Sequence, residues 1–282
     1  MYQLRRPDPN LTRFIEHYWF VTSDEGPVDL RVDVFVDARA DLIFNFGAPY
    51  TRRVIGGEAR EIATSNVDGQ RLEPIRIEQR GLVRTTGVRF RLGGLAPFAI
   101  VPLATLTDRT VAPRDALGDD ATPLEDTLRD TLDLDAQART LDAFFLRALD
   151  RTPDLVAFTR AIATAEGTHG GATVEAMAKS AAVSSRHLER LFARHLGVAP
   201  KTLARVLRFQ RALGALMRDP EGTLADVAAN AGYFDQAHFI KDFRRMTGGV
   251  PRGYRGYYPP QGPHDFAPNV VVFLQEGAEQ AS

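Results

Sequence analysis

The chain contains the stretch GYFDQAHFIKDFRRMTGGVPRGYR at residues 232–255, which decides how its second half folds. Asp235 is a residue type that caps helix N-termini, and Gly232 suits a tight turn between two helices. At about 100° per residue, Phe239, Phe243 and Met246 fall on one face of the following helix, opposite polar and basic residues. Glycines and a proline then end that helix. The stretch therefore predicts the second half of a helix-turn-helix.

A copy of this pattern lies about fifty residues upstream, which makes a chance match improbable. TVEAMAKSAAVS at residues 173–184 and TLADVAANAGYFD at residues 223–235 are both capped short helices followed by a turn and a second capped helix. We expect the two second helices at residues 185–196 and 236–247, joined by a helix at residues 201–217. At about 1.5 Å per residue the joining helix is about 25 Å long, of the order needed to place two reading helices in successive major grooves.

The charge of the chain is unevenly distributed. Residues 153–255 carry fifteen Lys and Arg against nine Asp and Glu, a net charge of +6, whereas residues 1–152 carry −4 and residues 256–282 carry −3. A positive segment on an acidic body suits a polyanionic partner, although arginine richness as a composition bias is the alternative. We expect double-stranded DNA as the partner, contacted in two adjacent major grooves, with the stronger charge in the first.

These residues resemble the AraC/XylS-type DNA-binding domain from about residue 153 to residue 255. In the first unit the resemblance rests on Ser184, Leu188, Arg190, Phe192, Gly197 and Pro200, and in the joining helix on Arg208 and Ala212. In the second unit it rests on Ala228, Gly232, Tyr233, His238, Phe239, Phe243, Gly248, Pro251, Tyr254 and Arg255. The resemblance implies a bacterial transcription factor with two helix-turn-helix units on one long helix.

The resemblance also implies which residues read DNA. The base-reading positions fall on Arg186, Glu189 and Arg190 in the first unit and on Gln236, Ala237 and Lys241 in the second. Ser184, Arg194 and Arg244 complete the set of DNA-binding candidates. Glu189 can accept a hydrogen bond from a cytosine amino group or pair with Arg186, and Ala237 can offer only a methyl contact. Arg190 and Lys241 are the strongest candidates.

Residues 1–150 predict an α+β domain, a strand-rich sheet or barrel followed by helices, ahead of an all-α double helix-turn-helix domain at residues 153–255. Its expected elements are a short helix at residues 10–16, strands near residues 31–36, 41–46, 53–56, 72–78 and 82–90, and a helix at residues 135–149. We place the domain boundary near residues 151–153. The tail, residues 256–282, contains the strand-like run NVVVFL at 269–274, which we expect to dock on the body.

The N-terminal half resembles a domain of unknown function that is often found ahead of AraC-type domains. The stretches that carry this resemblance are residues 9–19, 41–47, 87–94, 101–103 and 106–109. The family resemblance implies a domain that senses a ligand or dimerises. The sequence itself identifies no ligand-binding residue.

Several function classes are disfavoured by composition. The chain has no cysteine, residues 1–150 contain only His17, and no G-x-S-x-G motif occurs, so we expect no enzyme, metal or cofactor. The first ten residues lack the apolar core of a signal peptide, and the longest weakly polar run, residues 95–106, is too short to span a bilayer. We therefore expect a cytoplasmic protein that does not contact a membrane.

Two functions remain open at this point. The first is a sequence-specific regulator that responds to a small-molecule effector through its N-terminal domain. The alternative is a DNA-binding adaptor whose N-terminal domain binds a partner protein. A homodimer is compatible with either function, and contact with RNA polymerase is expected if the protein is an activator.

Overall fold

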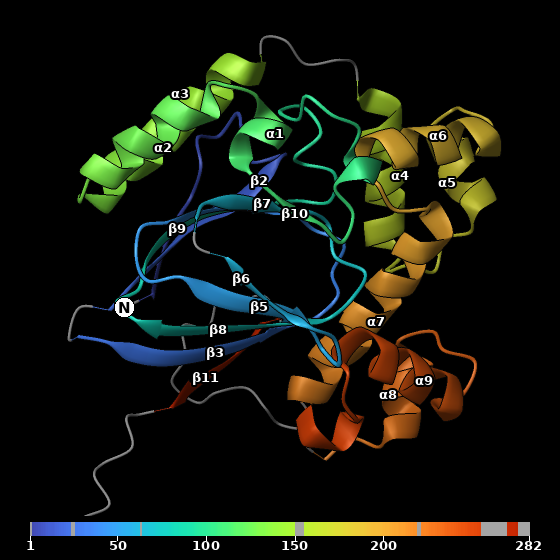
Figure 1. Ribbon diagram of the computed structural model, residues 1–282. Coiled ribbons are helices and arrows are strands. Elements are labelled where there is room, and N and C mark those ends of the chain that lie inside the picture. The colour runs from blue at the N-terminus through green and yellow to red at the C-terminus, as the bar shows by residue number, and fades with distance from the viewer. Residues whose placement is uncertain are drawn as a thin grey trace, which may run out of the picture.

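The computed structural model describes residues 2–23, 26–62, 64–149, 155–218, 221–254 and 270–275. Two stacked β-sheets with helices over one of them form the N-terminal part, and a purely helical part follows (Figure 1). This is the predicted fold class. The predicted boundary at residues 151–153 lies outside the described residues, as do Arg255 and most of the tail.

The strands of the described residues form two antiparallel sheets. The first has the order β1-β2-β9-β4-β7-β10 and the second the order β11-β3-β8-β5-β6. Their bounds are β1 Tyr2–Arg5, β2 Ile15–Thr22, β3 Val28–Val34, β4 Asp41–Asn45, β5 Tyr50–Val54, β6 Ala59–Ile62, β7 Asn66–Asp68, β8 Ile75–Gly81, β9 Arg84–Phe90, β10 Thr110–Val111 and β11 Val270–Gln275. The strand from the tail, β11, pairs with β3 at the edge of the second sheet.

The four helices predicted at residues 135–149, 185–196, 201–217 and 236–247 are present, each with its ends within one residue of the prediction. Their bounds are α1 Pro113–Leu117, α2 Ala121–Asp130, α3 Leu134–Leu149, α4 Val156–Gly167, α5 Val174–Ser180, α6 Ser185–His195, α7 Pro200–Arg218, α8 Leu224–Asn230 and α9 Gln236–Thr247, with 3-10 turns η1 Leu103–Thr105 and η2 Pro251–Tyr254. The range of α9 is the one predicted, because the Asp235 side chain caps its start and Gly248 ends it.

The first sheet buries one face against α2 and α3. Alternation along β2 and β9 puts Tyr18, Phe20, Val88 and Phe90 on that face, where all four are fully buried. Phe90 packs edge-on against Phe145 of α3, with ring centroids 5.7 Å apart. Each such side chain stabilises the fold by about 1.5–3 kcal/mol. This core fixes the helices α1–α3 on one side of the sheet.

The predicted helix at residues 10–16 is wrong. The chain forms turns up to Phe14 and then the strand β2. The Asp8 carboxylate accepts a hydrogen bond from the Asn10 amide at 2.8 Å, so this Asp-Pro-Asn segment builds a turn instead of a helix start. Pairing of β2 with β1 and β9 and burial of alternate side chains then prevail over local helix propensity.

The N-terminal part packs directly on the helical part. Phe35, Val36, Ala38 and Leu92 belong to the same core as the helices α4–α9. The Val36 amide donates to the Met246 carbonyl at 3.3 Å, and the side chain of Gln210 donates to the Val36 carbonyl. Since Met246 lies in α9 and Gln210 in α7, one loop after β3 holds two elements of the helical part.

Candidate nucleic-acid interface

The first helix-turn-helix consists of α5 and α6. Thr173 caps α5 by accepting from the Ala176 amide at 3.1 Å, and Ser184 caps α6 by accepting from the His187 amide at 3.2 Å. The turn between them places Ala182 at φ +55°, in the left-handed region. The sequence lacks glycine at this position, so an alanine carries the strained conformation.

The second helix-turn-helix, α8 and α9, repeats these interactions. Thr223 accepts from the Asp226 amide at 3.1 Å and Asp235 accepts from the His238 amide at 2.7 Å. Here Gly232 takes the left-handed position, at φ +82°. In this unit two residues, Tyr233 and Phe234, separate the left-handed residue from the N-cap, whereas in the first unit only Val183 does.

Each second helix has one buried face and one exposed face. Leu188 and Phe192 of α6 and Phe239 and Phe243 of α9 are fully buried. Phe243 packs against Phe209 of the joining helix, with ring centroids 5.9 Å apart. This packing fixes which side of each helix points outward.

All nine DNA-binding candidates lie on the exposed side. Ser184 is the N-cap of α6, and its hydroxyl is engaged in that cap. The exposed candidates on α6 are Arg186, Glu189, Arg190 and Arg194, and those at the start and along α9 are Gln236, Ala237, Lys241 and Arg244. Among the described residues, none of their charged groups forms a salt bridge within the chain, so these groups face solvent.

Two exposed residues that were not predicted from the sequence lie beside this set. Arg245 stands one turn after Lys241 on α9, and Phe234 precedes the N-cap of α9 with 93% of its surface exposed. The helical spacing of Arg245 from Lys241 could have revealed the former. With Arg245 included, α6 and α9 each present three exposed Lys or Arg side chains, so their number does not favour the first unit, and the stronger charge in the first groove stays a prediction.

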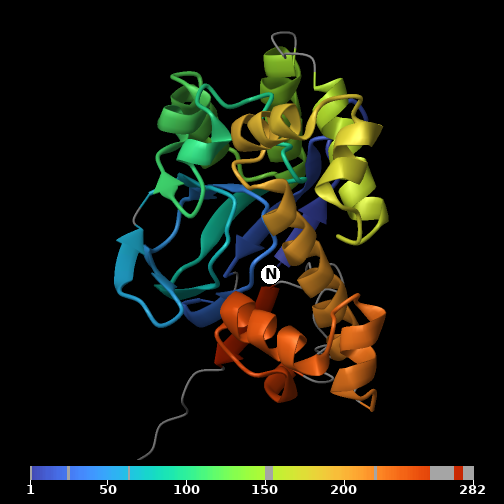
Figure 2. The ribbon, with the colours of Figure 1, turned by 90° about the vertical axis from the view of Figure 1, so that its right-hand side faces the viewer.

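The joining helix α7 ties the two units together (Figure 2). Its nineteen residues span about 28 Å at the usual rise. Arg205 of α7 pairs with the buried Asp242 of α9 at 3.3 Å, and the Arg208 guanidinium lies 5.9 Å from the ring centroid of Tyr233. These contacts hold α9 at a fixed angle to α7.

The N-terminal part also touches the first unit. The Thr107 hydroxyl donates to the Gly197 carbonyl at 2.8 Å, just after the end of α6. On the other side, a Cβ on Gly93 would lie 2.4 Å from the ring of Phe158 in α4, so the chains pass in close contact. Together with the Val36 contacts to α7 and α9, these contacts mean that both units are held by one N-terminal part.

The family models agree with this architecture. Residues 177–257 match the model described as a helix-turn-helix domain. The C-terminal part is an AraC-type helix-turn-helix domain. Residues 3–112 match the model described as a domain of unknown function (DUF6597). Both predicted resemblances are confirmed.

Individual relatives are similar over different lengths. The chain is 35% identical over 80 residues to the HTH-type transcriptional regulator GlxA of Rhizobium meliloti, covering 28% of this chain and 24% of GlxA. It is 28% identical over 226 residues to the transcriptional activator NphR of a Rhodococcus species, covering 78% of this chain and 61% of NphR. The chain thus spans less than two thirds of either relative. A structure of ToxT from Vibrio cholerae aligns with 83% of this chain and 97% of its own, at 11% identity and a TM-score of 0.47.

The facing surfaces of the two sheets form a second candidate site. Arg52 of β5 donates to Asp68 of β7 at 3.0 Å, which joins the sheets and identifies their inner faces. The pairing registers place Trp19 on the inner face, with its ring lying over Gly87. Ile43, Val34 and Ile75 are buried on these faces, whereas six other apolar side chains there are only partly buried: Leu4, Trp19, Val21, Leu30, Val32 and Ile77. The AraC-type domain is therefore attached to a sheet sandwich in which some inner apolar side chains retain accessible surface.

A buried ion-pair chain runs from this inner face toward the AraC-type domain. The Trp19 side chain lies close enough to Asp41 to lower the pKa of that carboxyl, Arg89 bonds Asp41 at 2.5 Å, and Arg89 also bonds Asp37. Burial raises the pKa of Asp41 to about 6, against the lowering effect of Arg71. Asp37 directly follows Val36, so the ion-pair chain ends next to the residue that contacts α7 and α9.

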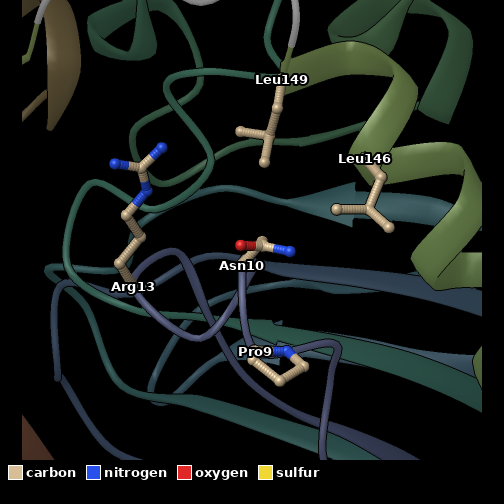
Figure 3. A pocket seen from close by; sticks show the side chains of 5 residues that line it. All are labelled: Pro9, Asn10, Arg13, Leu146 and Leu149. Atoms are coloured by element: carbon tan, nitrogen blue, oxygen red, sulfur yellow. The ribbon is translucent and has the colours of Figure 1, made fainter.

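Other potential sites are poorly developed. A pocket of about 590 Å³ is lined by Pro9, Asn10, Arg13, Leu146 and Leu149, whose side chains stand around an open space (Figure 3). Within the described ranges, no group of three or more His, Cys, Asp or Glu side chains is arranged to hold a metal ion. No helix of the described residues is both long and apolar enough to cross a membrane.

Proposed function

We propose that this protein is a sequence-specific transcription regulator that reads DNA with α6 and α9. The observation that supports this most strongly is the pair of capped helix-turn-helix units on one joining helix, each with an exposed cationic face. Major grooves on one face of DNA recur about every 34 Å, and α7 has the length to bridge successive grooves. One chain would then contact two half-sites.

The nine exposed candidates would divide the work of recognition. Arg190 and Lys241 occupy equivalent positions two residues before Phe192 and Phe243, and each would reach into a groove. Arginine and lysine bond the acceptor edge of guanine, whereas Gln236 suits adenine. The N-cap Ser184 and the cations Arg194 and Arg244 would contact the phosphate backbone, since such groups fix register without reading sequence.

Selection of duplexes from a random pool by the full-length protein tests this function. We expect enrichment of one sequence with two protected stretches on one face, about 10 base pairs apart. Affinity should fall steeply with salt, because phosphate contacts release counterions. Failure to enrich any sequence, or a flat salt dependence, would refute the proposal.

We also propose that the N-terminal domain binds a small-molecule effector between its sheets. Partly exposed apolar side chains on facing sheets are unusual for a close-packed interior, and they offer a ligand an apolar wall. The ion-pair chain through Arg89 offers a physical route, because displacing one member of a buried pair leaves its partner uncompensated. A ligand that moves Trp19 would thereby act on the loop that holds α7 and α9.

Trp19 is the only tryptophan in the chain, so its fluorescence reports on this surface alone. A panel of small molecules screened by thermal shift, followed by Trp19 titration, should find a class that raises the melting temperature and changes the emission. If every class fails on both readouts, the adaptor alternative is favoured, and a partner protein should be sought instead.

A further inference from the structure

Phe234 is the most exposed large apolar side chain of the helical part, at 93% exposure. It directly precedes Asp235, which caps α9, and it is the additional residue that the second turn has over the first. A fully exposed phenylalanine leaves a large apolar surface in water, which nothing in this turn requires. The turn itself is complete without it, because Gly232 supplies the left-handed conformation and Tyr233 supplies the buried ring.

The surroundings of Phe234 match DNA better than an apolar protein surface. Gln236 and Ala237 follow it at the exposed start of α9, the end of a reading helix that approaches the bases. Exposed cations continue along the same helix: Lys241, Arg244 and Arg245. An exposed aromatic ring next to these cations suits a partner that has anionic groups on its outside and apolar groups further in. The thymine methyl in the major groove has this character.

We propose that Phe234 contacts a thymine methyl group at the edge of the second half-site and sets a preference for thymine there. This inference rests on the proposed DNA-binding function. It assigns apolar readout to the second unit, in addition to the hydrogen bonds of Gln236 and Lys241. The first unit has no equivalent, since Val183 is followed at once by the N-cap Ser184.

The experiment uses a duplex that the full-length protein selects from a random pool, and replaces each thymine in turn by deoxyuridine. This change removes only the methyl group. We expect one substitution in the second half-site to weaken wild-type binding about fourfold, the value of one buried methyl-sized group. The Phe234→Ala variant should bind the parent duplex about tenfold more weakly and should be insensitive to that same substitution.

Controls separate this inference from the function on which it rests. Leu132→Ala removes another exposed apolar side chain, 77% exposed in the N-terminal part, and should leave affinity unchanged. If Phe234→Ala binds DNA as wild type does, or remains equally sensitive at the same thymine, the inference is overturned while DNA binding stands. Lost transcription with unchanged affinity would also overturn it and would point to RNA polymerase. If no duplex is enriched at all, the proposed function itself fails.

Discussion

The two helix-turn-helix units form the same hydrogen bonds from different residues. Both open with a threonine cap, and in both the residue after the left-handed position donates to a helix carbonyl at 3.0 Å, Val183 to Ala178 and Tyr233 to Ala228. They differ in that left-handed residue, Ala182 against Gly232. Capping and core packing therefore impose the turn geometry, since the first unit adopts it without glycine.

The units also differ in how the N-terminal part holds them. Gly197 after α6 lies against backbone and a buried amide, whereas Gly248 after α9 lies against the side chain of Ile55. The glycine after α6 is therefore packed against groups that cannot move easily, whereas the glycine after α9 is packed against a side chain that can change its rotamer. The following predictions test this difference and the others between the units.

The largest effect is expected from Gly197→Ala. Its Cβ would lie 2.1 Å from Gln70 Nε2 and 2.6 Å from the Leu103 carbonyl oxygen. Left-handed strain and overpacking together should lower the free energy of unfolding by about 3 kcal/mol, measured by urea denaturation. Gly248→Ala should cost less, and Ile55→Ala should restore part of the loss in that background. Equal losses of unfolding free energy in the two variants, with no rescue by Ile55→Ala, would contradict the difference in packing between the two glycines.

Arg190→Ala and Lys241→Ala compare the two units in DNA binding. Each should weaken binding to the selected duplex by about 1–3 kcal/mol if it touches a base, measured by gel shift at fixed salt. Arg114→Ala, at an exposed arginine of α1, serves as the control and should leave affinity unchanged. Wild-type affinity in both variants would show that the groove assignment is wrong.

A pair of turn substitutions isolates backbone strain. Gly232→Ala adds a Cβ whose nearest atom is Arg208 Cδ at 3.8 Å, so strain rather than a clash should lower the free energy of unfolding by about 1 kcal/mol. Ala182→Gly should raise it by about 0.5–1 kcal/mol, because relief of strain exceeds the added chain entropy. Both changes are measured by urea denaturation. Destabilisation by Ala182→Gly would show that the first turn is not strained.

The smallest effect concerns pH. His195 of α6 and Met246 of α9 are equivalent buried residues, and burial lowers the pKa of His195, with Arg194 adding to the shift. Because the unfolded chain binds the proton more readily, stability from this group is present above about pH 6.5 and is lost as pH falls toward the lowered pKa. Urea denaturation across this range should show a shallower acid loss in His195→Met. The Asp41 contribution is common to both proteins and cancels in the difference.

The helical part could be predicted from sequence because its determinants are local. Caps at Thr173 and Asp235 and the glycine after α9 lie within a few residues of the helix ends they define. The spacing of Phe239 and Phe243 likewise identifies the buried face, and so the exposed candidates. Phe234 escaped notice because a periodicity argument disregards residues in turns.

The N-terminal part was less accessible because its determinants are distant in sequence. The strand β2 depends on partners more than sixty residues away in β9, so local capping at Asn10 suggested a helix instead. The ion pair of Arg89 with Asp41 joins residues 48 positions apart, and no spacing rule indicates it. The packing of Val36 on α7 and α9 joins residues still farther apart, so the link between the N-terminal part and the helical part emerged only from the structure.

The loop after β3 contacts α7 and α9, and Thr107 contacts the first unit. These contacts link the unfolding of the N-terminal part to that of the helical part. Separate domains on a loose linker melt in steps, each with its own transition. Here the Phe35–Ala38 segment belongs to the helical core while Asp37 belongs to the ion-pair chain of the sheets. Unfolding of either part would expose buried surface of the other, so we expect the two parts to unfold together in a single cooperative transition.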